Sequence, residues 1–129
     1  AGLFFEPTVI TDCDTSMRIV QEEVFGPVVT VEGFSNEEEA IRLANDSIYG
    51  LAGAVFSKDI GKAQRVANQL KLGTVWINDF HPYFAQAPWG GYKQSGIGRE
   101  LGKEGLEEYL TSKHILTNTN PEPVNWFSK

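Results

Sequence analysis

The sequence predicts an α/β fold with a parallel-type sheet and helices on its faces. Strand-like and helix-like segments alternate through the middle of the chain, which is typical of strand–helix–strand units. The two helix-like segments each carry apolar residues on one face, as helices that cover a sheet do. The chain has 129 residues, which is the size of one domain.

Short elements are predicted near the N-terminus. Residues 5–11 (FEPTVIT) are rich in strand formers, and residues 16–20 have room for one or two helical turns. Gly26 and Pro27 then interrupt the chain, and residues 28–34 (VVTVEGF) alternate well enough to predict a second strand.

Two capped helices follow. Ser35 and Glu38 form a capping box, so we expect a helix to start there and to end at residues 45–47. Asp59 caps a second predicted helix over residues 60–70, which Gly73 ends. Residues 54–57 and 74–78 are the strands on either side of that second helix.

The last third of the chain begins with a long irregular segment. Residues 79–98 are rich in Gly, Pro and aromatic residues and have no clear period, and a loop of this length is usually functional. Residues 99–110 predict a helix, and residues 112–119 (SKHILTNT) predict a strand. We therefore expect one unit over residues 1–111 and a separate strand and tail over residues 112–129, in which Trp126 and Phe127 are buried or docked on a partner.

Composition excludes several classes of partner. Eleven basic against seventeen acidic residues give a net charge of -6, which disfavours nucleic acid and anionic membranes. No apolar run approaches the roughly 18 residues of a membrane span, and the N-terminus does not resemble a signal peptide. Cys13 is the only cysteine, so we expect a reducing, cytoplasmic location.

Residues 21–27 (QEEVFGP) are the first candidate site. They place Glu22, Glu23 and the ring of Phe25 just before a rigid turn. A carboxylate can accept two hydrogen bonds from a vicinal diol such as a ribose, and an aromatic ring can pack beside a planar one. From these residues alone, a charged helix end followed by a core Phe is the more economical interpretation.

Residues 88–102 (PWGGYKQSGIGRELG) are the second candidate, with five glycines in fifteen residues. They lack both the Gly-x-Gly-x-x-Gly dinucleotide pattern and the Gly-Lys-Ser/Thr phosphate loop. The glycines therefore predict tight turns at a pocket wall or an interface.

Aromatic residues in the long loop are the third candidate: Phe80, Tyr83, Phe84 and Trp89. They form either a local mini-core, which the residues alone slightly favour, or a wall that holds a cationic, apolar ligand by its ring faces. Cys13 lies between two acids that disfavour a thiolate, and the two histidines have no ligand spacing for zinc.

These segments together resemble the aldehyde dehydrogenase superfamily. Four of its motifs occur in order: EEVFGP from Glu22, NDSIYGL from Asn45, GTVWIN from Gly73 and PWGGYKQSGIGRELG from Pro88. The stretch from Asn78 to Gly96 is similar to the bacterial betaine-aldehyde dehydrogenase branch, and Trp89 fits a trimethylammonium substrate.

The resemblance implies NAD(P)-dependent oxidation of an aldehyde, with betaine aldehyde oxidised to glycine betaine. In the family a cysteine thiolate attacks the aldehyde, hydride passes to the nicotinamide, and water hydrolyses the thioester. Neither the nucleophile motif (Gly-Gln-x-Cys) nor the general-base motif (Glu-Leu-Gly-Gly-Lys) is present. The chain therefore resembles the C-terminal part of the catalytic domain plus the oligomerisation strand, and we expect it to be inactive alone.

The roles that the resemblance implies are limited to this part. Glu23 would bind the nicotinamide ribose of NAD or NADP, and Phe25 would pack near the nicotinamide. Tyr83 and Trp89 would line the substrate tunnel. Glu100 would be a buried proton relay, and the backbone oxygens of Lys93 and Gly96 would be ligands of an intersubunit potassium ion.

Three hypotheses remain open at this point. The chain is part of a betaine-aldehyde dehydrogenase-like homo-oligomer, part of an aldehyde dehydrogenase with another substrate, or a stand-alone interaction module.

Overall fold

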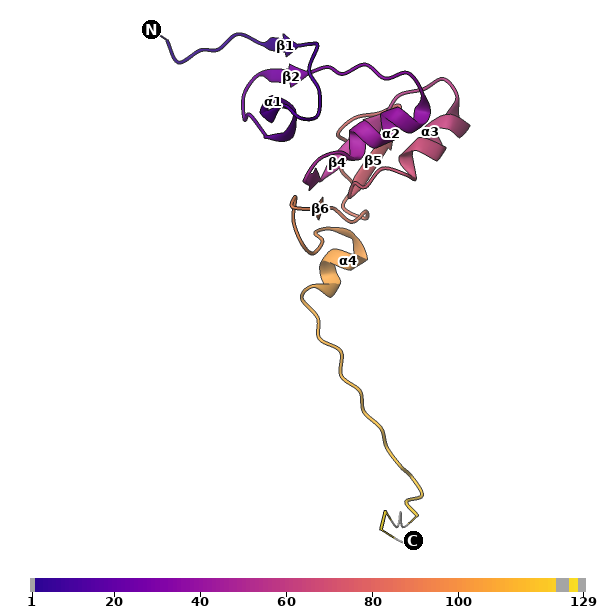
Figure 1. The fold of residues 1–129 in the computed structure, drawn as a ribbon. Coiled ribbons are helices and arrows are strands. Elements are labelled where there is room, and N and C mark those ends of the chain that lie inside the picture. Colours follow the sequence, from indigo (N-terminus) through magenta and orange to yellow (C-terminus); the bar gives the residue numbers. More distant parts are fainter. Residues whose placement is uncertain (1, 123–125, 128–129) are drawn as a thin grey trace.

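The computed structural model describes residues 2–122 and 126–127. Its N-terminal unit contains β1 (Thr8–Ile10), the short α1 (Arg18–Gln21) and β2 (Val28–Thr30). Strands β1 and β2 pair in parallel, with Thr8 opposite Val28, and α1 lies in the connection between them (Figure 1). The strands and the helical turn predicted here are confirmed, with each strand shorter than its pattern.

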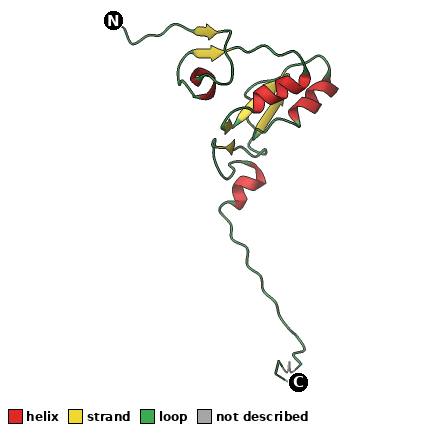
Figure 2. Ribbon diagram, viewed as in Figure 1, coloured by secondary structure: helices red, strands yellow, loops and turns green. Residues whose placement is uncertain are grey.

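The second unit holds two helices beside a parallel strand pair. It runs through α2 (Glu37–Asn45), β3 (Tyr49–Gly50), β4 (Ala52–Val55), α3 (Ile60–Ala67) and β5 (Thr74–Ile77). Strand β4 pairs in parallel with β5, with Ala54 opposite Trp76, and α3 forms the crossover between them. Helices α2 and α3 lie side by side over this pair (Figure 2), joined by the Arg65–Glu37 ion pair at 2.9 Å.

The predicted α/β class is confirmed, but the strands do not form one continuous sheet. The described residues form three two-stranded sheets: β1–β2, β4–β5, and the antiparallel pair of β3 with β6 (Tyr92–Lys93). Strand β6 gives the predicted loop its one short regular element. Strand β2 does not pair with β4, so the first strand–helix–strand unit stays open.

Helix α2 starts one residue later than its predicted capping box. The side chain of Asn36 accepts a hydrogen bond from the Glu39 amide at 2.9 Å, and the Glu39 carboxylate accepts one from the Ser35 amide at 2.7 Å. Two hydrogen bonds like those of a capping box are therefore present, but Asn36 and Glu39 make them instead of Ser35 and Glu38. The predicted cap of α3 is confirmed, since Asp59 accepts from the Lys62 amide at 2.9 Å.

Two helices are shorter than predicted. Helix α3 ends at Ala67, before the predicted Leu70. Helix α4 is Gly102–Glu107, not residues 99–110, because Glu100 is held in an extended pairing with Trp89 and Leu101 has a positive φ of 61°. A helix cannot begin until the chain leaves those conformations.

The strand predicted over residues 112–119 does not form. These residues are extended and exposed, with Ile115 and Leu116 at 74% and 84% exposure, and no other described strand lies beside them (Figure 1). A strand needs a pairing partner for its backbone N–H and C=O groups, and the described residues supply none at that point. Trp126 and Phe127 are likewise exposed, which contradicts burial within this chain.

The chain leaves much of its apolar surface uncovered. Ala63 is the only hydrophobic side chain that is fully buried among the described residues. The accessible surface is 10896 Å² for a 14.3 kDa chain, whereas a folded monomer of that mass exposes about 6,800 Å². None of the described helices has the length and apolar character that crossing a bilayer requires.

Candidate functional site

Aromatic rings gather where β5 ends and the long loop begins. Trp76, the third residue of β5, lies at the centre of the group, with its ring centroid 5.6 Å from Phe80, 6.4 Å from Tyr83 and 6.2 Å from Trp89. Tyr83 and Trp89 meet edge to face at 4.6 Å, a favoured geometry for aromatic pairs. His81 contacts Tyr83 at 5.0 Å and completes the cluster.

Hydrogen bonds fix this loop on β5. The indole N–H of Trp76 donates to the Pro82 carbonyl at 3.1 Å, and the Tyr83 hydroxyl lies 3.2 Å from Nε2 of His81. The aromatic wall, defined as Trp76, Phe80, His81, Tyr83 and Trp89, is therefore held by its own contacts.

The rings are packed together but are not sealed. Phe80 is 66% exposed and Tyr83 49%, so their faces remain available to a ligand. The mutual packing of these rings confirms the local mini-core, and the ligand wall stays a prediction. Phe84 is outside it, with no ring partner among the described residues. The sequence did not identify Trp76 and His81 as members of this cluster. Trp76 was interpreted only as part of the predicted strand over residues 74–78, and His81 only as a candidate zinc ligand.

Glu100 is tied to Trp89 through the backbone. Trp89 N–H donates to the Glu100 carbonyl at 2.6 Å, and Glu100 N–H donates to the Trp89 carbonyl at 2.7 Å. The two residues therefore move together. The side chain of Glu100 is exposed, which corrects the expectation of a buried acid, because no described segment covers it.

The two carboxylates before the Phe-Gly-Pro turn have different surroundings. Glu22 receives a two-pronged hydrogen bond from Arg18 at 2.7 and 2.8 Å, which holds the pKa of Glu22 below its usual range. Glu23 has no hydrogen-bond or ion-pair partner among residues 2–122 and 126–127. It lines an open cleft of about 390 Å³ between α1 and the 44–52 segment. Of the pair, Glu23 is the carboxylate that is free to accept hydrogen bonds from a ligand.

Phe25 projects away from the chain. Its backbone has a φ of 52°, an unusual value for an aromatic residue, and its side chain is 91% exposed. A positive φ before Gly26 and Pro27 turns the ring outward. The interpretation of Phe25 as a core residue is therefore wrong for this chain.

The glycine-rich segment is folded back on β3. Gln94 N–H donates to the Ile48 carbonyl at 2.9 Å, and the Gly50 amide donates to the Ser95 hydroxyl at 2.9 Å. The guanidinium of Arg99 donates to the Gly91 carbonyl and lies 5.4 Å from the Tyr92 ring centroid. Lys93, the last residue of β6, has a φ of 52°, and Gly96, which follows the turn closed by the Ser95 amide on the Tyr92 carbonyl, has a φ of 150°.

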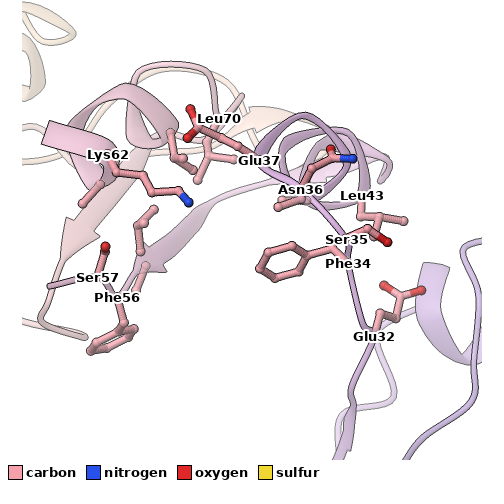
Figure 3. Close-up of a pocket in the computed structure, with 16 residues that line it drawn as sticks. Glu32, Phe34, Ser35, Asn36, Glu37, Leu43, Phe56, Ser57, Lys62 and Leu70 are labelled. Atoms are coloured by element: carbon pink, nitrogen blue, oxygen red, sulfur yellow. The ribbon is translucent and has the colours of Figure 1, made fainter. Parts of the chain in front are cut away.

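A further hollow lies away from the aromatic wall and from Glu23. It has a volume of about 620 Å³ and lies between α2, α3 and β4, with Phe34 and Phe56 on opposite sides of its opening (Figure 3). Its floor is aliphatic, and the Glu37 carboxylate on its rim is paired with Arg65. Glu32 and Lys62 also line it, and the buried Oε1 of Glu32 has no hydrogen-bond partner among the described residues.

Cys13 and the metal-ligating side chains complete the survey. The Cys13 thiol is near the carbonyls of Ile10 and Val31, at 3.7 and 3.8 Å, with no base beside it. In the part of the chain that the structure describes, no three His, Cys, Asp or Glu side chains are grouped to hold a metal ion.

The structure defines part of an α/β protein that has one aromatic wall, one free carboxylate close to a projecting ring, and uncovered core surface. The chain belongs to the aldehyde dehydrogenase family, whose model matches residues 1–115.

Individual relatives agree with this assignment. The chain is 72% identical over 127 residues to the betaine aldehyde dehydrogenase of Bacillus subtilis (strain 168), covering 98% of this chain and 26% of the relative. It is 56% identical over 126 residues to a peroxisomal aminoaldehyde dehydrogenase of Malus domestica, again over 98% of this chain and 25% of the relative. The chain thus spans about a quarter of the length of the curated relatives that it matches.

Solved structures match in the same way. A betaine aldehyde dehydrogenase from Staphylococcus aureus in complex with NAD+ is 93% identical, with a TM-score of 0.93, over 99% of this chain and 25% of that one. Other structures of that enzyme carry substitutions of a consecutive His, Pro and Tyr. A BME-modified cysteine of that enzyme lies more than twice as far before its triplet as Cys13 lies before His81. Cys13 is therefore not its counterpart.

Proposed function

We propose that these residues are the C-terminal section of an NAD-dependent enzyme that oxidises betaine aldehyde to glycine betaine. The observation that carries this proposal is the aromatic wall, which presents partly exposed ring faces to a ligand. A trimethylammonium group is a large, weakly hydrated cation, and ring faces attract such groups electrostatically. High identity to bacterial betaine aldehyde dehydrogenases supports the same substrate.

Tyr83 and Trp89 are the proposed substrate contacts. Their edge-to-face packing at 4.6 Å sets two ring planes at 73°, so that a compact cation can touch both. His81, Pro82 and Tyr83 have the same residue types, in the same order, as the substituted triplet of the Staphylococcus aureus enzyme. This coincidence supports the loop as part of the substrate site.

Glu23 and Phe25 are the proposed cofactor contacts. The free Glu23 carboxylate can accept two hydrogen bonds from the hydroxyls of a nicotinamide ribose, while Glu22 is occupied by Arg18. The outward ring of Phe25 can pack beside the nicotinamide. The bound nicotinamide would accept the hydride of the reaction. We propose NAD over NADP because the similar enzyme was solved with NAD+.

Three further roles are proposed for the glycine-rich segment. Glu100 would relay protons once other residues cover it, and its backbone bridge to Trp89 would keep it beside the substrate wall. The carbonyls of Lys93 and Gly96 would bind potassium between subunits. Carbonyl oxygens suit a hard monovalent cation, and the two residues are only three positions apart in the sequence.

The section is proposed to act only within a larger assembly. Its uncovered surface and its unpaired segment over residues 112–119 support contact with other parts of the enzyme and with another subunit. A cytoplasmic homo-oligomer is the proposed form. By itself the chain would supply one wall and one clamp, without the nucleophile.

Substitution of Trp89 tests the substrate. In the intact enzyme, Trp89→Phe should raise the KM for betaine aldehyde about tenfold while changing the KM for its neutral isostere, 3,3-dimethylbutanal, less than twofold. The matched control is Phe84→Leu, because Phe84 is an exposed aromatic residue of the same loop outside the aromatic wall. Equal losses for both aldehydes would contradict a cation-binding wall, and a preference of the unsubstituted enzyme for a primary aminoaldehyde would move the substrate to that class.

A further inference from the structure

The proposed cofactor clamp and the aromatic wall are carried by different units of the chain. Glu23 and Phe25 follow α1 in the N-terminal unit, while Trp89 and the glycine-rich segment belong to the second unit (Figure 1). A hydride donor and its acceptor must be held about 3–3.5 Å apart for efficient transfer, so something must set the spacing between these units.

One side chain makes that connection. The amide nitrogen of Gln21 donates to the Thr15 carbonyl at 2.9 Å and to the Asp46 carbonyl at 2.9 Å. Among the described residues, the bond to Asp46 is the only hydrogen bond that joins residues 2–31 to residues 36–122. Gln21 is half-buried and lies two residues before Glu23, at the wall of the cleft that Glu23 also lines.

The turn that receives this bond is itself firmly held. The Lys93 ammonium donates to the carbonyls on either side of Asp46, Asn45 at 3.0 Å and Ser47 at 2.9 Å. A cation at this position also stabilises the C-terminal end of α2, which carries the partial negative charge of the helix dipole. The Asn45 side chain binds the segment after α3, donating to the Gln69 carbonyl at 2.9 Å and accepting from the Lys71 amide at 2.7 Å.

The 45–47 turn is therefore a junction between the two proposed binding elements. Lys93 attaches it to the glycine-rich segment that follows Trp89, and Gln21 attaches it to the segment that carries Glu23. Both connections use side-chain donors on backbone carbonyls, so neither depends on what occupies the site.

We infer that Gln21 is a positioning residue that fixes the Glu23–Phe25 segment on the 45–47 turn and so sets its distance from the aromatic wall. This inference rests on the proposed function. It assigns Gln21 an effect on cofactor binding through the position of Glu23, since both of its amide N–H groups are directed at the carbonyls of Thr15 and Asp46.

The test is Gln21→Glu in the intact enzyme. The carboxylate has nearly the same size but no donor, and it faces two carbonyl oxygens, so both bonds are lost without a packing change. We expect the dissociation constant for NAD, measured by calorimetry, to rise about tenfold, with the KM for the aldehyde within twofold of its original value. Gln21→Leu, which also removes the donors but adds no charge, should give about fivefold.

Gln64→Glu is the matched control, because Gln64 is exposed on α3 and makes no side-chain hydrogen bond in the described structure. It should leave both constants unchanged. Unchanged NAD affinity in both Gln21 variants, or a parallel rise of both constants with a loss of folded enzyme, would overturn the inference. Failure to oxidise betaine aldehyde would reject the proposed substrate alone, because NAD affinity still reports on Gln21.

Discussion

Replacing Asn78 with alanine should loosen the open end of the β4–β5 pair. Asn78 follows β5, and its side chain continues the ladder that the backbone ends. Its Oδ1 accepts from the Ser57 amide at 2.8 Å, and its Nδ2 donates to the Ser57 carbonyl at 2.8 Å. One side chain thus satisfies both backbone groups of Ser57, which follows the neighbouring strand β4.

The magnitude follows from two losses. Two partly exposed hydrogen bonds contribute about 1 kcal/mol together, at the low end of the usual range. Asn78 also has a φ of 55°, a conformation that asparagine tolerates and that costs alanine about 1 kcal/mol more. The sum of about 2 kcal/mol corresponds to roughly a 30-fold increase in local opening.

Hydrogen exchange of the Ser57 amide, followed by mass spectrometry in the intact enzyme, measures that opening. Asn78→Gly removes the bonds but accepts the positive φ, so it should show only about a fivefold increase. Asn68→Ala is a control with ordinary helical dihedrals and no side-chain hydrogen bond in the described structure. Exchange in Asn78→Ala equal to that of the unsubstituted enzyme, or slower than in Asn78→Gly, would refute the reasoning.

Three further predictions concern stability. Gly73→Ala should lower the free energy of unfolding by more than about 3 kcal/mol, because a Cβ there would lie 1.7 Å from the Gly90 carbonyl oxygen. The cooperative thermal transition should then be lost. A normal transition would contradict this close approach. Asp59→Ala should lower stability by about 1 kcal/mol in thermal unfolding through loss of the α3 cap, whereas Asp59→Asn should retain most of it. The hydrogen bond from Arg65 holds the pKa of Glu37 below its usual range. The pair therefore stabilises the fold above about pH 4.3, the ordinary pKa of glutamate. This contribution is lost as the pH falls through the lowered pKa of the folded state. NMR titration of the Glu37 carboxyl should show that lowered pKa, and Arg65→Met should return it to the ordinary value.

The helices and strands with local signals could be predicted from the sequence. Asp59 caps α3 as its position predicts, and the apolar periodicity of α2 and α3 places them beside the β4–β5 pair. These features depend on residues within a few positions of one another, which is the range over which capping and periodicity act.

Features set by distant residues could not be predicted. The start of α4 depends on the bridge between Trp89 and Glu100. Strands β2 and β4 do not pair, although the alternation of strands and helices predicts one sheet. Residues 112–119 have the pattern of a strand, but none of the described residues pairs with them.

Some residues of the candidate site could be predicted from the sequence and others could not. Tyr83 and Trp89 were identified from residue type and family resemblance, and the structure brings them together. Trp76 and His81 were missed as site residues, because their contribution depends on how the loop folds back on β5. The difference between Glu22 and Glu23 was also beyond the sequence, since it follows from the side-chain geometry of Arg18.

The central claim is that this chain supplies one wall and one cofactor clamp to a larger enzyme. Its most direct test compares NAD-dependent oxidation of betaine aldehyde by the intact enzyme and by the purified 129-residue chain, with its 14.3 kDa mass verified. The account predicts turnover by the intact enzyme and none by the chain alone. Turnover by the verified chain, or none by the intact enzyme with this substrate, would contradict it.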